Sequence, residues 1–223
     1  MEREADFSLL ERLYASPRLA AYAEAINARM EDEARRRQAF FDQITEDDKA
    51  EFINGEVVAH SPVKLRHASV GQHLFALLSA YVNSHELGFV GFEKILVSLT
   101  RNDYEPDICF FGRDKADAFT PDQMRFPAPD LAVEVLSPST EANDRGVKFE
   151  DYAAHGVAEY WLVDPDTETI EQYRLADDAY ELVMKSKSGD LESAAVAGFV
   201  VPVRAIFDAA IHRATLAGIA RAG

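Results

Sequence analysis

Cysteine is almost absent from this sequence, in which Cys109 is the single one among 223 residues. One cysteine cannot form a disulfide within a chain, which favours a reducing compartment. The sequence also has no run approaching the ~18 apolar residues that a membrane-spanning helix needs, and no apolar N-terminal segment of the signal-peptide type. We therefore expect a soluble cytoplasmic protein that does not contact a membrane.

Positive charge is scarce as well, with 23 lysine and arginine residues against 39 acidic residues and a formal net charge of -16. So acidic a chain is not expected to bind nucleic acid nonspecifically, and any such contact must use a local positive rim. The sequence shows no internal repeat, helix-turn-helix or zinc-finger pattern. Its length and its 48% hydrophobic content suit one α/β domain with an appendage.

Glycine is missing from the first 42 residues, and their alanine-, glutamate- and arginine-rich composition predicts a helical arm over residues 1–42. Ser16 is a suitable N-cap, and Pro17 would then occupy the first helical position. An apolar stripe at helical spacing follows, formed by Leu19, Tyr22, Ala23, Ile26 and Met30. Nothing else in the arm would cover this stripe, so we expect it to pack on the domain or on a second copy, and we expect a homodimer.

Residues 43–210 carry alternating strand and helix patterns and are expected to form the α/β domain, with residues 211–223 as a C-terminal tail. Asn54 and Gly55 predict a type I′ hairpin turn. Strand patterns occur over residues 89–99, 104–111, 131–136, 159–165, 169–175 and 179–184.

Two helices are expected within this domain. The first begins at Arg66 and is expected to stop at Gly88. The second is expected over residues 141–156, with Ser139 or Thr140 as its cap.

A glutamate interrupts the strand pattern PDLAVEVLSPST, which begins at Pro129. In an extended chain the apolar residues 131, 133 and 135 share one face, and Glu134 lies on the other face between Ala132 and Leu136. A carboxylate on a buried strand is costly to desolvate unless it is paired or binds a metal. Glu134 is therefore a candidate functional residue.

A second acid, Asp107, lies in the strand pattern YEPDICFF. The two strands can lie side by side, and two carboxylates in a partly dry site repel each other unless a positive charge lies between them. Mg²⁺ or Mn²⁺ would supply that charge, with oxygen ligands from Asp107, Glu134 and the backbone carbonyl of Val135. The alternative is a salt bridge from each acid to a lysine or arginine.

Lys148 is the candidate positive partner near the substrate phosphate. It lies in the helix after the Glu134 strand and shares a helical face with Asp144, Asp151 and Tyr152. If that helix packs across the sheet, Lys148 could position a water and stabilise charge on phosphorus. The alternative is an exposed lysine paired with Asp144 or Asp151. On the catalytic interpretation, Lys148→Ala abolishes cleavage and leaves the fold largely intact.

Several of these stretches together resemble a known family. They are EFINGEVVAHSPVKLRHASVGQHL, YEPDICFF, PDLAVEVLSPST, DRGVKFEDYAAHGVAEYWLVDP and GDLESAAVAGFVVPVRAIFD. The combination resembles the Uma-type restriction endonuclease family, formerly a domain of unknown function, in the PD-(D/E)XK nuclease superfamily. The resemblance spans roughly residues 42–208 and implies a three-layer α/β/α restriction endonuclease-like core with a central mixed sheet. The helical arm is an extension of that core.

The resemblance also implies site residues. Asp107 and Glu134 match the metal-binding acids of the superfamily. Its usual lysine, two positions after the Glu, is replaced here by Leu136, and Lys148 matches a lysine displaced to the following helix. Supporting residues in this reading are Glu56, His67 and Tyr152, where Glu56 would hold a second metal or a water and His67 would contact phosphate.

The implied activity is hydrolysis of a phosphodiester, most naturally in DNA, by a water activated by Mg²⁺ or Mn²⁺. The positive rim for DNA would be formed by Lys64, Arg66, Arg113, Arg145 and Lys148. The rival interpretation is a catalytically inactive nuclease fold that acts in protein binding or assembly, which the acidic charge and the missing in-line lysine would suit. Hydrolysis of another phosphate ester is a third possibility.

Overall fold

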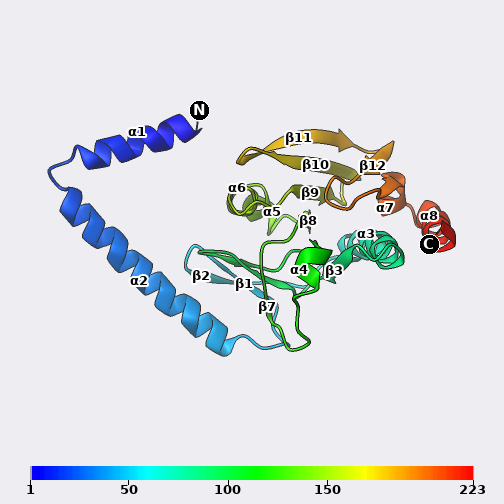
Figure 1. Ribbon diagram of the computed structural model, residues 1–223, viewed down its shortest axis with the longest axis horizontal. Helices are drawn as coiled ribbons and strands as arrows, with labels where there is room; N and C mark the ends of the chain where they lie inside the picture. The colour runs from blue at the N-terminus through cyan, green and yellow to red at the C-terminus, as the bar shows by residue number, and fades with distance from the viewer. Residues whose placement is uncertain (1, 223) are drawn as a thin grey trace.

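The computed structural model describes the backbone of residues 2–222 and the side chains of residues 7–221. Met1 and Gly223, the outer ends of the expected arm and tail, lie outside the described residues. Two helices, α1 (Glu2–Tyr14) and α2 (Leu19–Gln43), extend from an α/β body (Figure 1). The N-terminal segment is therefore helical, as expected, but it forms two helices.

The break between α1 and α2 follows from Pro17, which has no backbone N–H and restricts the residue before it to extended conformations. Ser16 accepts a hydrogen bond from the backbone N of Arg18 at 3.1 Å. Helix α2 then begins at Leu19 without a side-chain cap. The expectation that Ser16 caps this helix and Pro17 starts it is thus wrong by two residues, since Arg18 is the N-cap residue.

A six-stranded mixed sheet forms the centre of the body. Its strand order is β11-β10-β9-β8-β6-β3, with β8 and β9 parallel and the other neighbours antiparallel. The strands are β3 (Gly88–Phe92), β6 (Ile108–Gly112), β8 (Leu131–Val135), β9 (Glu159–Asp164), β10 (Thr169–Ala176) and β11 (Ala179–Ser186). This sheet confirms the mixed α/β class expected from the sequence.

A smaller five-stranded sheet, of order β2-β1-β5-β4-β7, lies beside it. Its strands are β1 (Ala50–Ile53), β2 (Glu56–Ala59), β4 (Leu96–Ser98), β5 (Asp103–Tyr104) and β7 (Arg125–Phe126). Strands β1 and β2 form the expected hairpin. Asn54 and Gly55 have φ values of 51° and 87°, and left-handed values at both positions are what a type I′ turn requires.

The stretch expected as one strand over residues 89–99 supplies both sheets. Glu93 and Lys94 have positive φ values of 49° and 21°, which no continuous strand accommodates. The chain turns there, so β3 belongs to the large sheet and β4 to the small one. The bend separates two apolar runs whose sequence pattern alone looks continuous.

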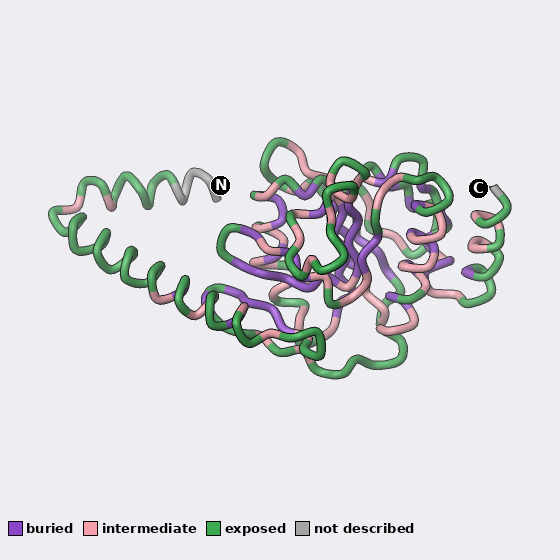
Figure 2. Tube along the Cα trace, turned by 60° about the horizontal axis from the view of Figure 1, so that its bottom comes forward, coloured by how far each residue is buried: buried purple, intermediate pink, exposed green. Residues whose placement is uncertain are grey.

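The large sheet is covered on both faces. Helix α3 (Leu65–Ser84) packs on one face, where the apolar residues 131, 133 and 135 of β8 join Leu74 and Leu77 in a buried cluster. The opposite face carries Ala132 and Leu136, which pack in a second cluster with Tyr152 of α6 (Val147–Ala154). Buried chain accordingly concentrates in the strands at the centre of the body (Figure 2).

The two helices expected within the domain differ from their predicted bounds. Helix α3 ends at Ser84, and Gly88 begins β3 rather than stopping the helix. The helix expected over residues 141–156 is divided into α5 (Glu141–Asp144) and α6, because Gly146, with φ -112° and ψ -106°, leaves the helical region. Thr140 precedes α5 without a side-chain capping bond.

The C-terminal part closes the α3 side of the large sheet. Strands β12 (Asp190–Glu192) and β13 (Val200–Pro202) pair with each other, and α7 (Arg204–Phe207) and α8 (Ala209–Ala222) follow. Helix α8 lies along α3, where the rings of His73 and His212 stack 4.2 Å apart. A short helix, α4 (Arg113–Ala116), follows β6. Over the described part of the chain, no helix combines the length and apolarity needed to cross a membrane.

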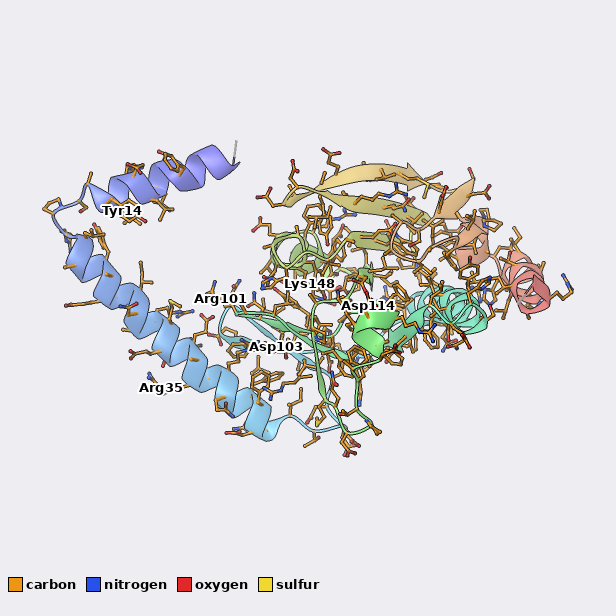
Figure 3. All side chains as sticks on the ribbon, viewed as in Figure 1. Tyr14, Arg35, Arg101, Asp103, Asp114 and Lys148 are labelled. Atoms are coloured by element: carbon orange, nitrogen blue, oxygen red, sulfur yellow. The ribbon has the colours of Figure 1, made fainter. Side chains whose placement is uncertain are left out.

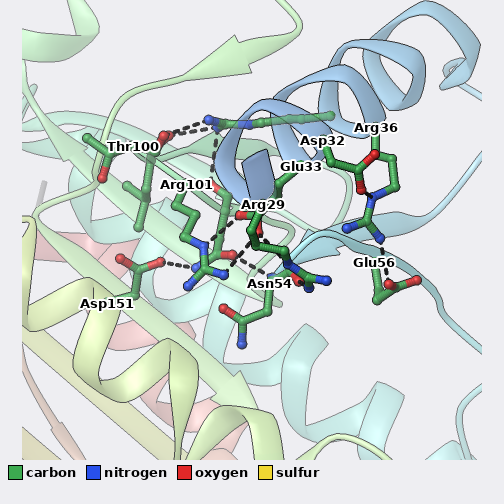
Figure 4. A network of polar contacts seen from close by, with 12 residues as sticks. Arg29, Asp32, Glu33, Arg36, Asn54, Glu56, Thr100, Arg101 and Asp151 are labelled. Atoms are coloured by element: carbon green, nitrogen blue, oxygen red, sulfur yellow. Dashed lines mark hydrogen bonds and ion pairs between the residues drawn. The ribbon is translucent and has the colours of Figure 1, made fainter. Parts of the chain in front are cut away.

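The C-terminal half of α2 is anchored to the small sheet by ion pairs. Arg37 donates two hydrogen bonds to the buried Asp103, at 2.6 and 2.8 Å. Arg101 donates two to Glu33, at 2.6 and 2.9 Å (Figure 4). The N-terminal half of α2 projects away from the body, and α1 turns back from its far end (Figures 1 and 2). The apolar stripe of α2 is therefore uncovered in one copy of the chain, and Ile26 is 52% exposed.

Candidate active site

Lys148 lies inside the protein, where helix α6 meets the two sheets (Figure 3). Its side chain is 2% exposed. The Lys148 Nζ is 2.8 Å from Glu51 Oε1 of β1, 3.1 Å from Glu134 Oε1 of β8 and 3.2 Å from Asp144 Oδ1 of α5. Asp151, which shares its helical face, instead accepts a hydrogen bond from Tyr104 at 2.8 Å. The alternative of an exposed lysine therefore does not hold.

The three carboxylates fix the charge state of Lys148. Burial disfavours the ammonium, but attraction to the carboxylates, led by Glu134, outweighs this and raises the pKa of Lys148 well above its ordinary value. The pKa of Glu134 is also raised well above its ordinary value. Burial is the main cause, and repulsion from the other acids raises this pKa further. The attraction of Lys148 lowers it but does not outweigh these two effects. One ammonium thus does not compensate all the acids, and the site has an excess of negative charge.

The sequence predicted that Asp107 lies inside a strand. It lies directly before β6 instead. Its Oδ2 accepts a hydrogen bond from the backbone N of Val135 at 2.8 Å, and His67 Nε2 is 3.7 Å from the same oxygen. Lys49 Nζ is 3.8 Å from Oδ1. Burial raises the pKa of Asp107, but these donors and positive charges outweigh it and lower the pKa below its ordinary value. Asp107 is therefore ionised at neutral pH.

A cavity of about 180 Å³ opens at these residues. Its walls include Asp107, Glu134, Val135 and Lys148, which the structure brings together as expected. The other residues around the cavity are the loop residues Ser61 to Lys64 with Arg66 and His67 of α3 on one side, Leu136 to Thr140 on another, and Lys49, His60, Glu105, Asp144, Pro165 and Asp166. Two of the expected rim residues, Lys64 and Arg66, are thus at the cavity.

The structure also adds site residues that the sequence did not single out. The first is Glu51, which also contacts Lys148. Its Oε2 lies 3.3 Å from His60 Nε2. Its Oε1 accepts a hydrogen bond from the backbone N of Glu105 at 2.9 Å. Glu51 is buried within the strand AEFI. The reasoning that identified Glu134, an acid on a buried strand, could have found it.

Glu105 lines the cavity with a buried carboxyl group. Its Oε2 has no hydrogen-bond partner among the described residues. Burial, with repulsion from Glu51, raises the pKa of Glu105 to about 7. A signal for it was present in the sequence, since Glu105 directly precedes the Pro-Asp pair that contains Asp107.

Three expected site residues lie elsewhere. Glu56 is exposed at the turn end of the hairpin and pairs with Arg36 of α2 at 2.6 Å (Figure 4). Arg113 follows the far end of β6 from Asp107 and pairs with Asp117 at 3.8 Å.

Arg145, the third of these residues, is bound to Glu171, with two hydrogen bonds of 2.8 and 3.0 Å, and it is not among the residues around the cavity. Lys148 belongs to the cavity but is too deeply buried to form part of a rim. Tyr152 is fully buried behind the site, and its hydroxyl has no hydrogen-bond partner within the described chain.

A divalent cation such as Mg²⁺ in this cavity would require oxygen ligands. In residues 7–221, no group of three histidine, cysteine or acidic side chains is arranged to hold a metal ion by itself. Mg²⁺ commonly takes only one or two carboxylates and completes its shell with water and phosphate oxygens. Asp107 and Glu134 supply two carboxylates, and the unpaired Oε2 of Glu105 adds a free oxygen. The oxygen-rich, negatively charged cavity fits a cation of this kind.

Residues 37–204 match the Uma2 family, described as "Putative restriction endonuclease". Two proteins of Synechocystis sp., "Uncharacterized protein slr1290" and "Uncharacterized protein sll1609", are similar to this chain. The first is 30% identical over 145 residues, which are 64% of this chain and 75% of that protein. The second is 28% identical over 140 residues, which are 61% of this chain and 77% of that protein.

The fold is shared with a solved structure described as "a putative nuclease belonging to DUF820 from Anabaena variabilis". That structure has a TM-score of 0.65 and 17% identity, and the match covers 79% of this chain and 96% of the other. The family match spans well over half of the sequence and includes the acids, the lysine and both sheets of the site. The chain therefore belongs to the Uma2 family of restriction endonuclease-like proteins.

Proposed function

We propose that this protein is an endonuclease that uses Mg²⁺ or Mn²⁺ to hydrolyse phosphodiester bonds in DNA. The observation that carries the proposal is the buried Lys148 ammonium, 3.1 Å from Glu134, in one cavity with Asp107. Membership of a restriction endonuclease-like family supports nuclease activity. The metal and the choice of DNA are parts of the proposal.

The cation would be held by Asp107, Glu134 and the backbone carbonyl of Val135. When bound, it supplies an activated water and neutralises charge on the phosphate. The lowered pKa of Asp107 keeps that carboxylate ionised and ready to bind. Burial, with repulsion from the neighbouring acids, raises the pKa of Glu134, so a cation between the two acids would favour the ionised form of Glu134.

The chain's own residues have distinct roles in this proposal. Lys148 remains protonated because three carboxylates surround it, so it acts as a fixed positive charge and not as a base. Its charge would stabilise the negative charge that develops on the phosphate oxygens. Glu51 holds the ammonium in place. His67, beside Asp107, would orient that carboxylate and would contact the phosphate.

DNA would approach across Lys64 and Arg66, both exposed at the cavity. The body carries a large excess of acidic residues, so these contacts are local and should weaken steeply with added salt. The uncovered stripe of α2 leads us to propose a homodimer through the arm.

The test is incubation of the purified protein with plasmid DNA, single-stranded DNA and RNA, in Mg²⁺, Mn²⁺ or EDTA. We expect cleavage of DNA with either metal and none in EDTA, and Asp107→Asn should weaken Mn²⁺ binding measured by calorimetry. Cleavage that persists in EDTA would disprove the metal role.

A second candidate function is a catalytically inactive module for assembly. The observation that favours it is the exposed apolar face of the arm, which suits a protein partner. Absence of cleavage with every metal and nucleic acid, together with stable self-association, would support this candidate over the nuclease.

A further inference from the structure

The acids and the lysine lie deep in a small cavity. Lys148 is almost fully buried, and the cavity volume of about 180 Å³ is below the ~300–1,000 Å³ of typical small-molecule pockets. A phosphate group with a few waters fits such a volume. With Lys148 2% and Glu134 3% exposed, a nucleic acid reaches these groups most directly if its backbone projects inward at the step to be cut.

One wall of the cavity is formed by Ser61 to Lys64, which lie between β2 and α3, and by Arg66 in the first turn of α3. We call residues Val63 to Arg66 the rim segment. In it, Val63 is 50% exposed and Leu65 is 83% exposed. These apolar residues alternate along the sequence with two cationic residues, Lys64 and Arg66.

The two cations of the rim segment are available to phosphate. Lys64 forms no ion pair with any of the residues that the structure describes. Arg66 pairs with Asp166 alone among them, and both side chains of that pair are more than half exposed. An exposed pair of this kind contributes little to stability, so phosphate can replace the carboxylate at small cost.

The alternation of apolar and cationic side chains indicates what the rim segment contacts. Isolated exposed leucines are ordinary, but here Val63 and Leu65 alternate with two cations. Val63, Lys64 and Arg66 line the cavity, and Leu65 begins α3 beside it. Proteins that kink DNA insert apolar side chains between base steps while cations hold the flanking phosphates, at a cost of a few kcal/mol per unstacked step. A kinked step is also what a recessed site requires.

We infer that the rim segment is a wedge: Val63 and Leu65 unstack one base step, Lys64 and Arg66 hold the phosphates beside it, and the preferred substrate is DNA that is already unstacked at that step. This inference rests on the proposed function and specifies its substrate class. A bulged duplex is the simplest substrate of this class, because base stacking is already disrupted at the bulge.

The first test compares cleavage of a fully paired duplex with cleavage of the same duplex carrying a single-base bulge. We expect wild type to cut the bulged duplex about tenfold faster or more. Leu65→Ala should lower the rate on the paired duplex about tenfold and lower the rate on the bulged duplex by less. The matched control is Leu182→Ala, because Leu182 is also exposed but lies on β11, and it should match wild type on both substrates.

The second test does not depend on cleavage. A 2-aminopurine beside the bound step should become more fluorescent when wild type binds the paired duplex in Ca²⁺, and Leu65→Ala should lose that increase. Cleavage without an increase, without a bulge preference and without an effect of Leu65→Ala would overturn the wedge and leave the nuclease proposal standing. An increase without any cleavage would uphold the wedge and overturn the nuclease. A changed sedimentation coefficient for Leu65→Ala would assign the rim segment to a contact between copies and overturn the wedge.

Discussion

The Nζ of Lys148 lies 2.8 Å from Oε1 of Glu51, which joins helix α6 to the first strand of the small sheet. Both side chains are buried. A buried charge that loses its partner is far more costly than one that keeps it. The position of the lysine therefore depends on the docking of the two sheets as much as on its own helix.

Replacement of Lys148 should affect both rate and stability. We expect Lys148→Ala to slow cleavage by ~10²–10³, the usual loss for a group that stabilises charge in the transition state. The three carboxylates around it would be left uncompensated, which predicts a destabilisation of about 3–5 kcal/mol and revises the expectation of an intact fold. Cleavage assays at a temperature where circular dichroism shows folded protein, with urea unfolding, measure the two effects.

The control for Lys148 is Lys115→Ala, since Lys115 also binds a carboxylate, that of Asp130 at 2.7 Å, but lies away from the cavity and is partly exposed. It should cleave at the wild-type rate. A wild-type rate for Lys148→Ala would instead refute the charge-stabilising role.

Two glutamates of one hairpin provide a matched pair. Glu51 binds Lys148, whereas Glu56 is exposed and pairs with Arg36. We expect Glu51→Gln to lower the cleavage rate at least about tenfold by misplacing the ammonium, with little change in KM, and Glu56→Gln to remain within about twofold. An equal loss in both variants would return Glu56 to the site and contradict the assignment of Glu51.

Neighbouring arginines of α2 should differ in their contribution to stability. Arg37 binds the fully buried Asp103 with two hydrogen bonds and also donates to the carbonyl oxygen of Leu99 at 2.7 Å. Arg37→Ala should lower the free energy of unfolding by about 3–5 kcal/mol, because it leaves a buried carboxylate unpaired. The exposed Arg35, paired with Asp32, should cost less than about 1 kcal/mol when replaced by alanine. Similar urea midpoints for the two variants would be evidence against the anchoring role of Arg37.

Acid stability should depend on Glu171. Its hydrogen bonds with Arg145, against the opposing effect of burial, lower the pKa of Glu171 from 4.5 to about 2. Between these values the unfolded chain binds a proton that the folded chain does not, so stability falls as the pH is lowered through this window. At pH 6, Glu171→Gln should lose about 2 kcal/mol, and the gap to wild type should close as the pH approaches 2.

Urea unfolding at several pH values measures that gap, with Glu181→Gln, an exposed glutamate on β11, as the control. A gap for Glu171→Gln that is independent of pH would show that the carboxylate is not held ionised by Arg145.

The arm should mediate self-association. Ile26 lies at the centre of the exposed stripe of α2, and Ile26→Asp places a charge where an apolar contact is proposed. We expect wild type to sediment as a dimer at micromolar concentration and Ile26→Asp as a monomer, while Glu24→Gln on the same helix stays dimeric. A monomeric wild type would rule out this role for the arm.

The sequence alone determined a large part of this protein. The Asn54-Gly55 turn and the alternation along β8 are local consequences of backbone geometry, so they could be predicted without tertiary information. The mixed α/β class and the family followed from motif combinations that span most of the chain. Asp107, Glu134 and Lys148 were identified because charges on apolar segments need a reason, and the structure brings all three to one cavity.

Tertiary structure decided the remainder. Which glutamate of the hairpin reaches Lys148, Glu51 or Glu56, depends on how the small sheet docks on the large one, and no local pattern encodes that contact. The same holds for Arg145, which lies between α5 and α6 and whose partner Glu171 is on β10. Side-chain charge and spacing identify groups that require partners, but the partner is chosen by packing between segments distant in sequence.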